Sequence, residues 1–339
     1  MPDEGVYPAT AAARDRFVLE RRGPRPQHDP WRSQGLIVEN ERTAEGNRAR
    51  IATVLLTGRE CPWRCAMCDL WTYTTTSDTP RGAIPAQVAA ARAAVRDESI
   101  PVTGMKLYNA GSFFDPRAVP EADYDAIADE LDGLSRVIVE SHPALIGSRV
   151  DRLIEAFDRH RRPGHRPARL EVAMGLETAH PGALDRLNKR ITLDDFAHAA
   201  DALSRREVAL RVFLLIAPPF IPPDEQDTWL LRSIDAAFSF GATVVSLVPT
   251  RAGNGAIDAL AGAGVFHAPD LDDIERSFSL ALGHARGRGR VFVDVWDLER
   301  FAPCPHCASS RRDRLQAINL DQVILARRPC AACGSGVRQ

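Results

Sequence analysis

The 339-residue chain lacks any apolar run that approaches the roughly 18 residues typical of a membrane-spanning helix. Its first residues, Met1-Pro2-Asp3-Glu4, are acidic and do not introduce the apolar core of a secretion signal. The formal net charge is −2, which argues against nucleic-acid binding by bulk electrostatics but leaves local basic patches open. These absences predict a cytoplasmic protein with no membrane partner.

Cysteine is scarce, and its positions are more informative than its number. The seven cysteines fall into a group of three and a group of four: Cys61, Cys65, Cys68, and then Cys304, Cys307, Cys330, Cys333. Clusters of this kind, in a chain without a secretion signal, indicate metal ligation rather than disulfide bonds.

No Gly-x-Gly-x-x-Gly sequence follows the first predicted strand, which disfavours a dinucleotide-binding fold. From Arg50 onward, strand-like apolar runs alternate with helical patterns. The predicted strands are 51–57, 103–109, 136–141, 169–176, 209–217 and 242–248. This alternation implies an α/β protein with parallel strands and right-handed crossovers, arranged as a doubly wound sheet or an incomplete barrel.

Helical patterns fill the intervals between these strands. They are predicted at 84–96, 123–134, 150–159, 181–188, 192–205 and 224–240, with Thr192 and Asp195 spaced as a capping box. Before the first strand, residues 1–49 are rich in Arg, Pro and Gly and predict a loose lead-in with a short helix at 11–20. After the last strand, residues 256–300 predict a mixed extension and residues 301–339 a small metal-binding module.

The first cysteine group forms a C-x3-C-x2-C run, Cys61–Cys68, directly after the first predicted strand. Structural zinc normally takes four protein ligands, so three cysteines leave its geometry one short. A [4Fe–4S] cluster held by three thiolates instead keeps one iron free for another molecule. A zinc site completed from elsewhere, or cysteines that only pack, are the alternatives.

This run resembles the cluster motif of the radical S-adenosylmethionine (radical SAM) enzymes. The resemblance implies that the open iron binds S-adenosylmethionine (SAM), that one electron cleaves its C–S bond, and that the 5′-deoxyadenosyl radical abstracts a hydrogen from the substrate. It also implies a partial (β/α)6 TIM-type barrel over residues 50–255 and an electron donor such as flavodoxin or ferredoxin. In such barrels the chemistry lies at the carboxyl ends of the strands.

The stretch after the second predicted strand contains Asn109, Gly111 and Ser112. Many family members carry a Gly-Gly-Glu-type stretch here that holds the amino group of SAM. This chain has no Glu at that place, although its amide, hydroxyl and glycine offer hydrogen bonds and close approach of the backbone. A polar turn is the alternative interpretation.

Acidic and basic residues follow the third and fourth predicted strands. Glu140 lies in a stretch that resembles the Glu-x-x-Pro of the Elongator and oxygen-independent coproporphyrinogen oxidase branches, where this Glu contacts SAM. Glu177 and Arg190 resemble the Gly-x-Gln/Glu-Ser stretch and the following Arg of the same branches, which implies that they bind polar groups of SAM. For Arg190, the alternative is a charge that complements a helix dipole.

The second cysteine group consists of two C-x2-C pairs, Cys304/Cys307 and Cys330/Cys333. Four thiolates in this arrangement suit structural Zn²⁺, and an auxiliary [4Fe–4S] cluster is the rival. Arginines between the pairs give the module a basic face that binds phosphates or forms a solvated loop: Arg311, Arg312, Arg314, Arg327 and Arg328.

The resemblance is nearest to the Elongator-like group, which includes the radical subunit of archaeosine synthase, and to a subgroup with a similar four-cysteine module. It favours hydrogen abstraction from an RNA nucleoside or nucleoside-like substrate, with tRNA as partner, held by the basic C-terminal module. The same radical chemistry on a small molecule or peptide is the second hypothesis. A noncatalytic iron–sulfur or zinc scaffold is the third.

Overall fold

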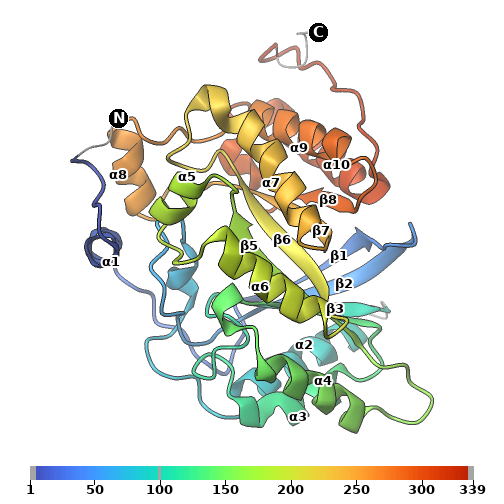
Figure 1. The fold of residues 1–339 in the computed structure, drawn as a ribbon. Coiled ribbons are helices and arrows are strands. Elements are labelled where there is room, and N and C mark those ends of the chain that lie inside the picture. Colours follow the sequence, from blue (N-terminus) through green and yellow to red (C-terminus); the bar gives the residue numbers. More distant parts are fainter. Residues whose placement is uncertain (1–4, 98–100, 335–339) are drawn as a thin grey trace.

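The computed structural model describes residues 5–97 and 101–334 and is organised around one curved sheet (Figure 1). The eight strands are hydrogen-bonded in chain order. They are β1 (Gly35–Arg42), β2 (Arg48–Leu56), β3 (Gly104–Asn109), β4 (Arg136–Glu140), β5 (Arg169–Glu177), β6 (Ala209–Ile216), β7 (Ala242–Pro249) and β8 (Arg290–Val293). β1 runs antiparallel to β2, and all later neighbours are parallel.

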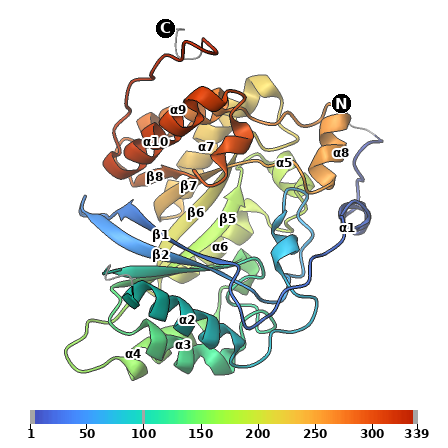
Figure 2. The same cartoon turned by 180° about the vertical axis from the view of Figure 1, so that it is seen from behind.

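The described residues form ten α-helices, and most of them cover the outer face of this sheet, as the two opposite views in Figures 1 and 2 show. They are α1 (Ala11–Glu20), α2 (Ala83–Asp97), α3 (Tyr124–Leu131), α4 (Ser148–His160), α5 (Pro181–Arg186), α6 (Leu193–Ser204), α7 (Gln226–Ser239), α8 (Ala256–Gly262), α9 (Leu271–Ala285) and α10 (Pro305–Asp321). α1 and α8 lie side by side near the carboxyl ends of the strands. The sheet curls into a partial TIM-type barrel, as predicted.

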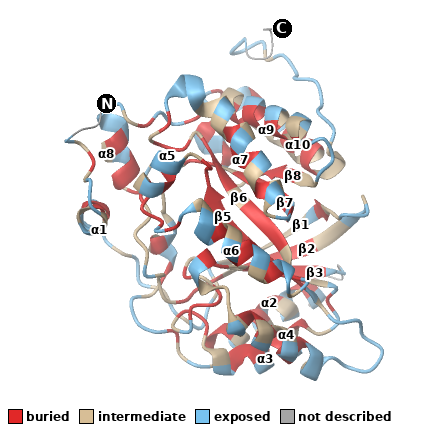
Figure 3. Ribbon diagram, viewed as in Figure 1, coloured by how far each residue is buried: buried red, intermediate tan, exposed pale blue. Residues whose placement is uncertain are grey.

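The apolar core lies between the curled sheet and its helices, where Figure 3 shows buried residues on the strands and on the inner helix faces. The central parallel strands read as nearly continuous apolar runs because both of their faces are covered. Thr192 and Asp195 form the predicted capping box at the start of α6. Among the described helices, none combines the length and apolar character needed to cross a bilayer.

A buried ion network fills the barrel near the amino ends of the strands. Glu41 of β1 accepts from Lys106 at 2.8 Å, Arg136 at 2.9 Å and Arg211 at 2.7 Å. Arg211 also bonds Glu171 at 2.6 Å. Removal of one partner from such a network leaves a buried charge uncompensated, which typically costs about 3–5 kcal/mol. The network therefore stabilises the end of the barrel opposite the carboxyl ends of the strands.

The backbone N–H and C=O groups at the free edge of β8 bond to two side-chain amides. One belongs to Asn319 in α10, and the other to Gln322, the C-cap residue of that helix. The Asn319 amide exchanges two hydrogen bonds of 2.9 Å with the backbone of Val293. The Gln322 amide exchanges two hydrogen bonds of 2.8 Å with the backbone of Val291. Because an exposed edge would offer unpaired N–H and C=O groups, these amides serve in place of a ninth strand.

The six predicted parallel strands correspond to β2 through β7, and the predicted helix at 11–20 corresponds to α1. The expectation of a loose lead-in before residue 50 was wrong in part. β1 pairs with β2 over its whole length, from Gly35 with Leu55 to Arg42 with Arg48. It also supplies Glu41 to the ion network, so this segment belongs to the barrel.

Candidate active site and metal centre

The loop that carries the first three cysteines follows β2 at the carboxyl-terminal end of the barrel. It is fixed from two sides by buried amides. Asn188 donates at 2.8 Å to the carbonyl of Arg64, and Asn254 donates at 2.7 Å to the carbonyl of Ala66. The Ala66 amide in turn donates at 2.9 Å to the carbonyl of Leu187. The loops that follow β5 and β7 therefore hold the cysteine loop in place.

The three cysteines of this loop are half-buried, and their thiols share one poorly solvated environment. Burial raises the pKa of Cys61 and Cys65, and it raises that of Cys68 to about 12. Cys68 and Cys61 also raise the pKa of Cys65, and Cys61 raises that of Cys68, because like charges repel. Thiolates at this place therefore require a cationic centre, which supplies the compensation that solvent does not.

The chemistry and spacing of this donor set fit a [4Fe–4S] cluster better than one zinc ion. In the described part of the chain, the only group of three or more potential ligands with all atoms mutually close is the C-terminal group of four cysteines. The loop cysteines do not form so compact a group. A cubane cluster places an iron atom under each thiolate, so its ligands stand farther apart than those of a single ion.

A buried ion pair lies beside these cysteines. Glu177, the last residue of β5, accepts a hydrogen bond of 2.5 Å from Lys189, and both side chains are about one-tenth exposed. Burial lowers the pKa of Lys189, but Glu177 and then Cys65 raise it, with a net increase. Lys189 therefore carries a positive charge next to the cysteine loop.

Gly175 provides the space for this pair. A Cβ atom at Gly175 would lie 2.1 Å from Oε1 of Glu177 and 2.3 Å from Nζ of Lys189, so a side chain there would displace the ion pair. Glu177 itself has φ of +68°, a left-handed conformation that is costly for a residue with a side chain. Such strain next to a buried charge is typical of functional sites.

Glu140 and Asn109, two predicted site residues, lie close to this pair. Burial raises the pKa of Glu140 to about 8, although Lys189 and the backbone amide of Asn109 oppose the increase. The side chain of Asn109 is buried, and neither its Oδ1 nor its Nδ2 has a hydrogen-bond partner among the described residues. A buried amide with both atoms unpaired is costly, so it indicates a place for a polar ligand.

Ser112 and Gly111 support the site from the loop after β3. The Ser112 hydroxyl accepts a 2.9 Å hydrogen bond from the backbone amide of His142, and Ser112 has φ of +75°. A Cβ at Gly111 would lie 2.0 Å from the carbonyl oxygen of Arg59, so glycine is required for this loop to meet the start of the cysteine loop. Both residues are thus engaged by the protein itself.

His142 covers the cysteine loop in its neutral form. Its ring stacks on Trp63 with centroids 3.5 Å apart and an angle of 9° between the planes. Burial lowers the pKa of His142 to about 3. Nδ1 accepts from the Ala144 amide at 3.2 Å, which leaves Nε2 to donate to the Lys189 carbonyl at 2.9 Å. The stacked pair shields the loop and fixes the backbone of Lys189.

Arg190, the predicted basic residue, points away from this group. Its guanidinium bonds Asp15 of α1 at 2.8 Å and Asn188 at 3.0 Å, and two-fifths of the side chain is exposed. The neighbouring Lys189, which sequence reasoning did not select, occupies the interior position instead. The physical reason is local: Asn188 and Arg190 both have positive φ, of 59° and 62°, so the chain follows no regular period here.

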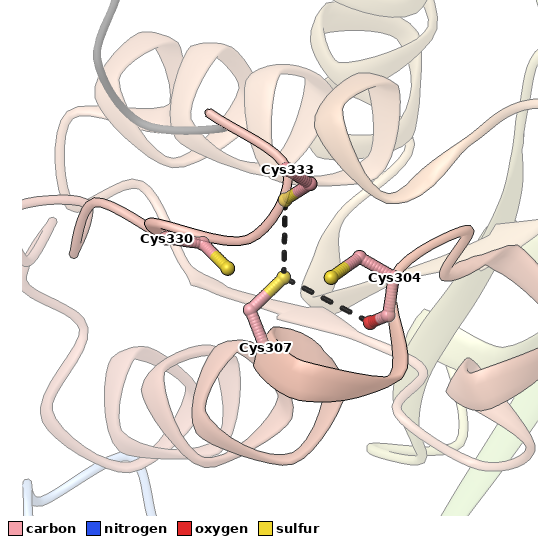
Figure 4. A group of neighbouring side chains, drawn as sticks. All are labelled: Cys304, Cys307, Cys330 and Cys333. Carbon is pink, nitrogen blue, oxygen red and sulfur yellow. Dashed lines mark hydrogen bonds between the residues drawn. The ribbon is translucent and has the colours of Figure 1, made fainter.

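The second cysteine group lies at the start of α10, where Figure 4 shows the four thiols converging from two segments. Cys304 and Cys307 flank the first turn of the helix, and Cys330 and Cys333 come from the tail. All four sulfurs lie within 4.8 Å of one another, and those of Cys307 and Cys333 are 3.8 Å apart. A single Zn²⁺ with tetrahedral Zn–S bonds of about 2.3 Å places its ligand sulfurs about 3.8 Å apart.

The basic face predicted for this module is largely neutralised. Arg311 bonds Asp272 at 2.6 Å and Glu275 at 2.9 Å. Arg314 and Arg327 also approach Glu275, at 3.2 and 3.3 Å. These guanidinium groups tie α10 and the tail to α9, so they are engaged within the protein and do not form an open phosphate-binding surface.

Comparisons with known proteins agree with this arrangement. No family model matches the chain. The chain is 26% identical over 315 residues to archaeosine synthase subunit beta of Methanosarcina acetivorans, a match that spans 88% of this chain and 86% of the relative. It is 30% identical over 124 residues to archaeosine synthase subunit beta of Thermococcus kodakarensis, which spans 34% of this chain and 35% of that one.

Among solved structures, the archaeal Elp3 of Methanocaldococcus infernus shares the fold, with a TM-score of 0.51 at 11% identity over 70% of this chain and 59% of that one. Two findings are more specific than the shared fold. They are the nearly full-length sequence match and the three-cysteine loop at the end of β2. Together these findings support a radical SAM enzyme of the Elongator- and archaeosine-synthase-like branch.

Proposed function

We propose that Cys61, Cys65 and Cys68 hold a [4Fe–4S] cluster and that the enzyme acts on an RNA nucleoside or nucleoside-like substrate. When bound, the cluster supplies the open iron for SAM and the electron that cleaves the C–S bond of SAM. An electron donor such as flavodoxin or ferredoxin is part of this proposal. The observation that carries it is the position of three half-buried cysteines beside the charged Lys189, with the unpaired amide of Asn109 close to the same ion pair.

The residues around the loop have distinct proposed roles. Lys189, oriented by Glu177, binds an anionic group of SAM, because a buried ammonium strongly favours a charged partner. Asn109 offers an unpaired donor and an unpaired acceptor. Glu140, with a pKa of about 8, is largely protonated at neutral pH and can donate a hydrogen bond. Ser112 and Gly111 shape the adjoining loop.

Two observations support an RNA substrate. The relative matched over most of its length is a subunit of archaeosine synthase by name. A groove of about 800 Å³ lies against α1, beside the loop after β5, and its lining includes the exposed side chains of Arg16, Arg21 and Glu20. Guanidinium groups near the site suit a phosphate backbone, whereas Arg311, Arg314 and Arg327 of the C-terminal module are paired with carboxylates.

The deciding experiment is an anaerobic assay of SAM cleavage. The protein is reconstituted with iron and sulfide, then mixed with SAM and dithionite, and 5′-deoxyadenosine is quantified. We expect product from the wild type and none from Cys65→Ala. If a cluster assembles in the wild type without SAM binding or cleavage, the proposed chemistry is wrong and a scaffold role is favoured.

Substrate class is tested by adding tRNA to the same reaction. An RNA substrate predicts that tRNA increases 5′-deoxyadenosine formation and that its affinity falls steeply with salt concentration. Cleavage that is unaffected by tRNA, together with no salt-dependent binding, would favour a small molecule or peptide substrate.

We infer that the four C-terminal cysteines hold one structural Zn²⁺. Their close sulfur spacing supports a single ion over an auxiliary [4Fe–4S] cluster. Elemental analysis of the Cys61→Ala/Cys65→Ala/Cys68→Ala variant should find one zinc and no iron per chain. Iron with the visible absorption of an iron–sulfur cluster in that variant would contradict the inference.

A further inference from the structure

Glu60, which directly precedes the first cluster ligand, is surrounded by three guanidinium groups. Its carboxylate accepts from Arg22 at 2.7 Å, from Arg25, and from Arg64 at 3.2 Å. The Glu60 side chain is one-tenth exposed, and that of Arg22 is even less so. We call these four residues the Glu60 ion cluster. It does not belong to the group around Lys189.

Two members of this ion cluster come from the segment before β1. Arg25 also donates to the carbonyl of Trp71 at 3.0 Å and to the Thr74 hydroxyl, both beyond the last cysteine of the loop. The guanidinium groups of Arg22 and Arg25 lie over the Trp71 ring, 4.8 and 5.5 Å from its centroid. This segment therefore binds the start and the end of the cysteine loop.

The Glu60 ion cluster is not neutral. Three guanidinium groups face one carboxylate, which leaves an excess of two positive charges in a partly buried place. Arg64 also donates to the backbone carbonyls of Cys61 at 2.8 Å and Trp63 at 2.9 Å, so the positive charge lies directly against the cysteine loop. Uncompensated positive charge is costly to bury, so a negatively charged neighbour is expected.

A thiolate-bound iron–sulfur cluster is such a neighbour, and nearby charge and solvent exposure set its reduction potential. We propose that Arg22 and Arg25, acting through Glu60, position the cysteine loop and raise the reduction potential of the cluster bound there. Arg22 and Arg25 are thus positioning residues that lie on a part of the chain outside the parallel barrel strands. This inference rests on the proposed [4Fe–4S] cluster.

The test is the midpoint potential of the reconstituted protein, measured by a reductive titration followed by electron paramagnetic resonance in the absence of SAM. Arg22→Gln and Arg25→Gln remove one charge each, and Arg22→Lys keeps the charge. Arg21→Gln is the matched control, because Arg21 lies on the same segment but stacks on Phe17 at 3.6 Å and does not contact Glu60. Iron and sulfide content is measured for every variant.

We expect a more negative potential in Arg22→Gln and Arg25→Gln than in the wild type and Arg21→Gln, with Arg22→Lys close to the wild type. The double Arg22→Gln/Arg25→Gln variant should also lose iron, because both ends of the loop are released. Equal potentials in all variants that retain a cluster would overturn this inference alone. Absence of a [4Fe–4S] signal in the wild type would overturn the proposed function, and this inference with it.

Should Arg22→Gln fail to hold a cluster, the comparison of Arg25→Gln with Arg22→Lys decides. A negative shift in Arg25→Gln that is absent from Arg22→Lys supports the inference. Potentials that shift equally in both variants contradict a role for charge.

Discussion

The Lys189 ammonium lies 2.5 Å from the Glu177 carboxylate inside the barrel, while the adjacent Arg190 bonds Asp15 on the outside. Two consecutive basic residues thus face opposite environments. The charge of Lys189 acts on Cys61 and Cys65 and lowers the pKa of both. The positions of these two side chains make them a matched pair for experiment.

Replacement of Lys189 by Gln should weaken SAM binding by about 10- to 100-fold, since a hydrogen bond to a charged group contributes about 1.5–3 kcal/mol. Arg190→Gln should change SAM affinity little, because the ion-pair partner of Arg190, Asp15, lies on α1. Equilibrium binding of SAM to the reconstituted protein measures both. A large loss in Arg190→Gln with none in Lys189→Gln would contradict the proposed roles.

The raised pKa of Glu140 predicts a dependence of stability on pH. The folded state binds this proton more tightly than the unfolded state, so the contribution of Glu140 to stability declines as the pH rises from the ordinary value of 4.5 toward about 8. Glu140→Gln, which imitates the protonated form, should therefore stabilise the protein more at pH 9 than at pH 6. Urea unfolding of both proteins at the two pH values measures this difference, and an equal effect at both would argue against a raised pKa.

Gly175→Ala should disturb the Lys189–Glu177 pair, because the new methyl group would occupy the position of the two charged atoms. We expect a loss of about 1–3 kcal/mol in stability, as for other overpacked sites, together with weaker SAM binding. Gly262→Ala is the control, since a Cβ there meets no atom within 4 Å. Thermal unfolding and SAM titration of the two variants provide the comparison; similar behaviour would show that the site can rearrange at little cost.

Asn319→Ala should leave the N–H and C=O of Val293 without partners at the edge of β8. Unsatisfied groups of this kind cost about 1–3 kcal/mol each. Asp313→Ala changes an exposed position of the same helix and serves as the control. Chemical unfolding measures the loss, and increased aggregation of Asn319→Ala should accompany it if the edge becomes available for pairing.

The parallel part of the barrel could be predicted because its strands are apolar on both faces and its helices have clear signals such as the Thr192–Asp195 capping box. β1 could not be predicted in this way, because it ends in polar residues whose partners, among them Lys106 and Arg211, are distant in the sequence. The helix α10 was not predicted, because its sequence contains many charged residues and their ion-pair partners on α9 are distant in the sequence.

Cys61, Cys65 and Cys68 could be predicted as site residues, because closely spaced cysteines in such a chain indicate metal binding. The roles of Lys189 and Arg190 could not be predicted, because two basic side chains are adjacent and the segment is neither a regular helix nor a strand. Only the three-dimensional course of the loop, with left-handed conformations at Asn188 and Arg190, decides which of the two faces the interior.

Helix α10 begins beside the four-cysteine group and ends with the amides that complete the edge of β8. We therefore expect the last strand of the barrel and the four-cysteine group to unfold together, with the proposed metal stabilising both. A chain cut before Cys304 would lose the partners of β8 as well as the metal. Shortage of that metal in the cell would then reduce the amount of folded enzyme, even if iron and SAM were plentiful.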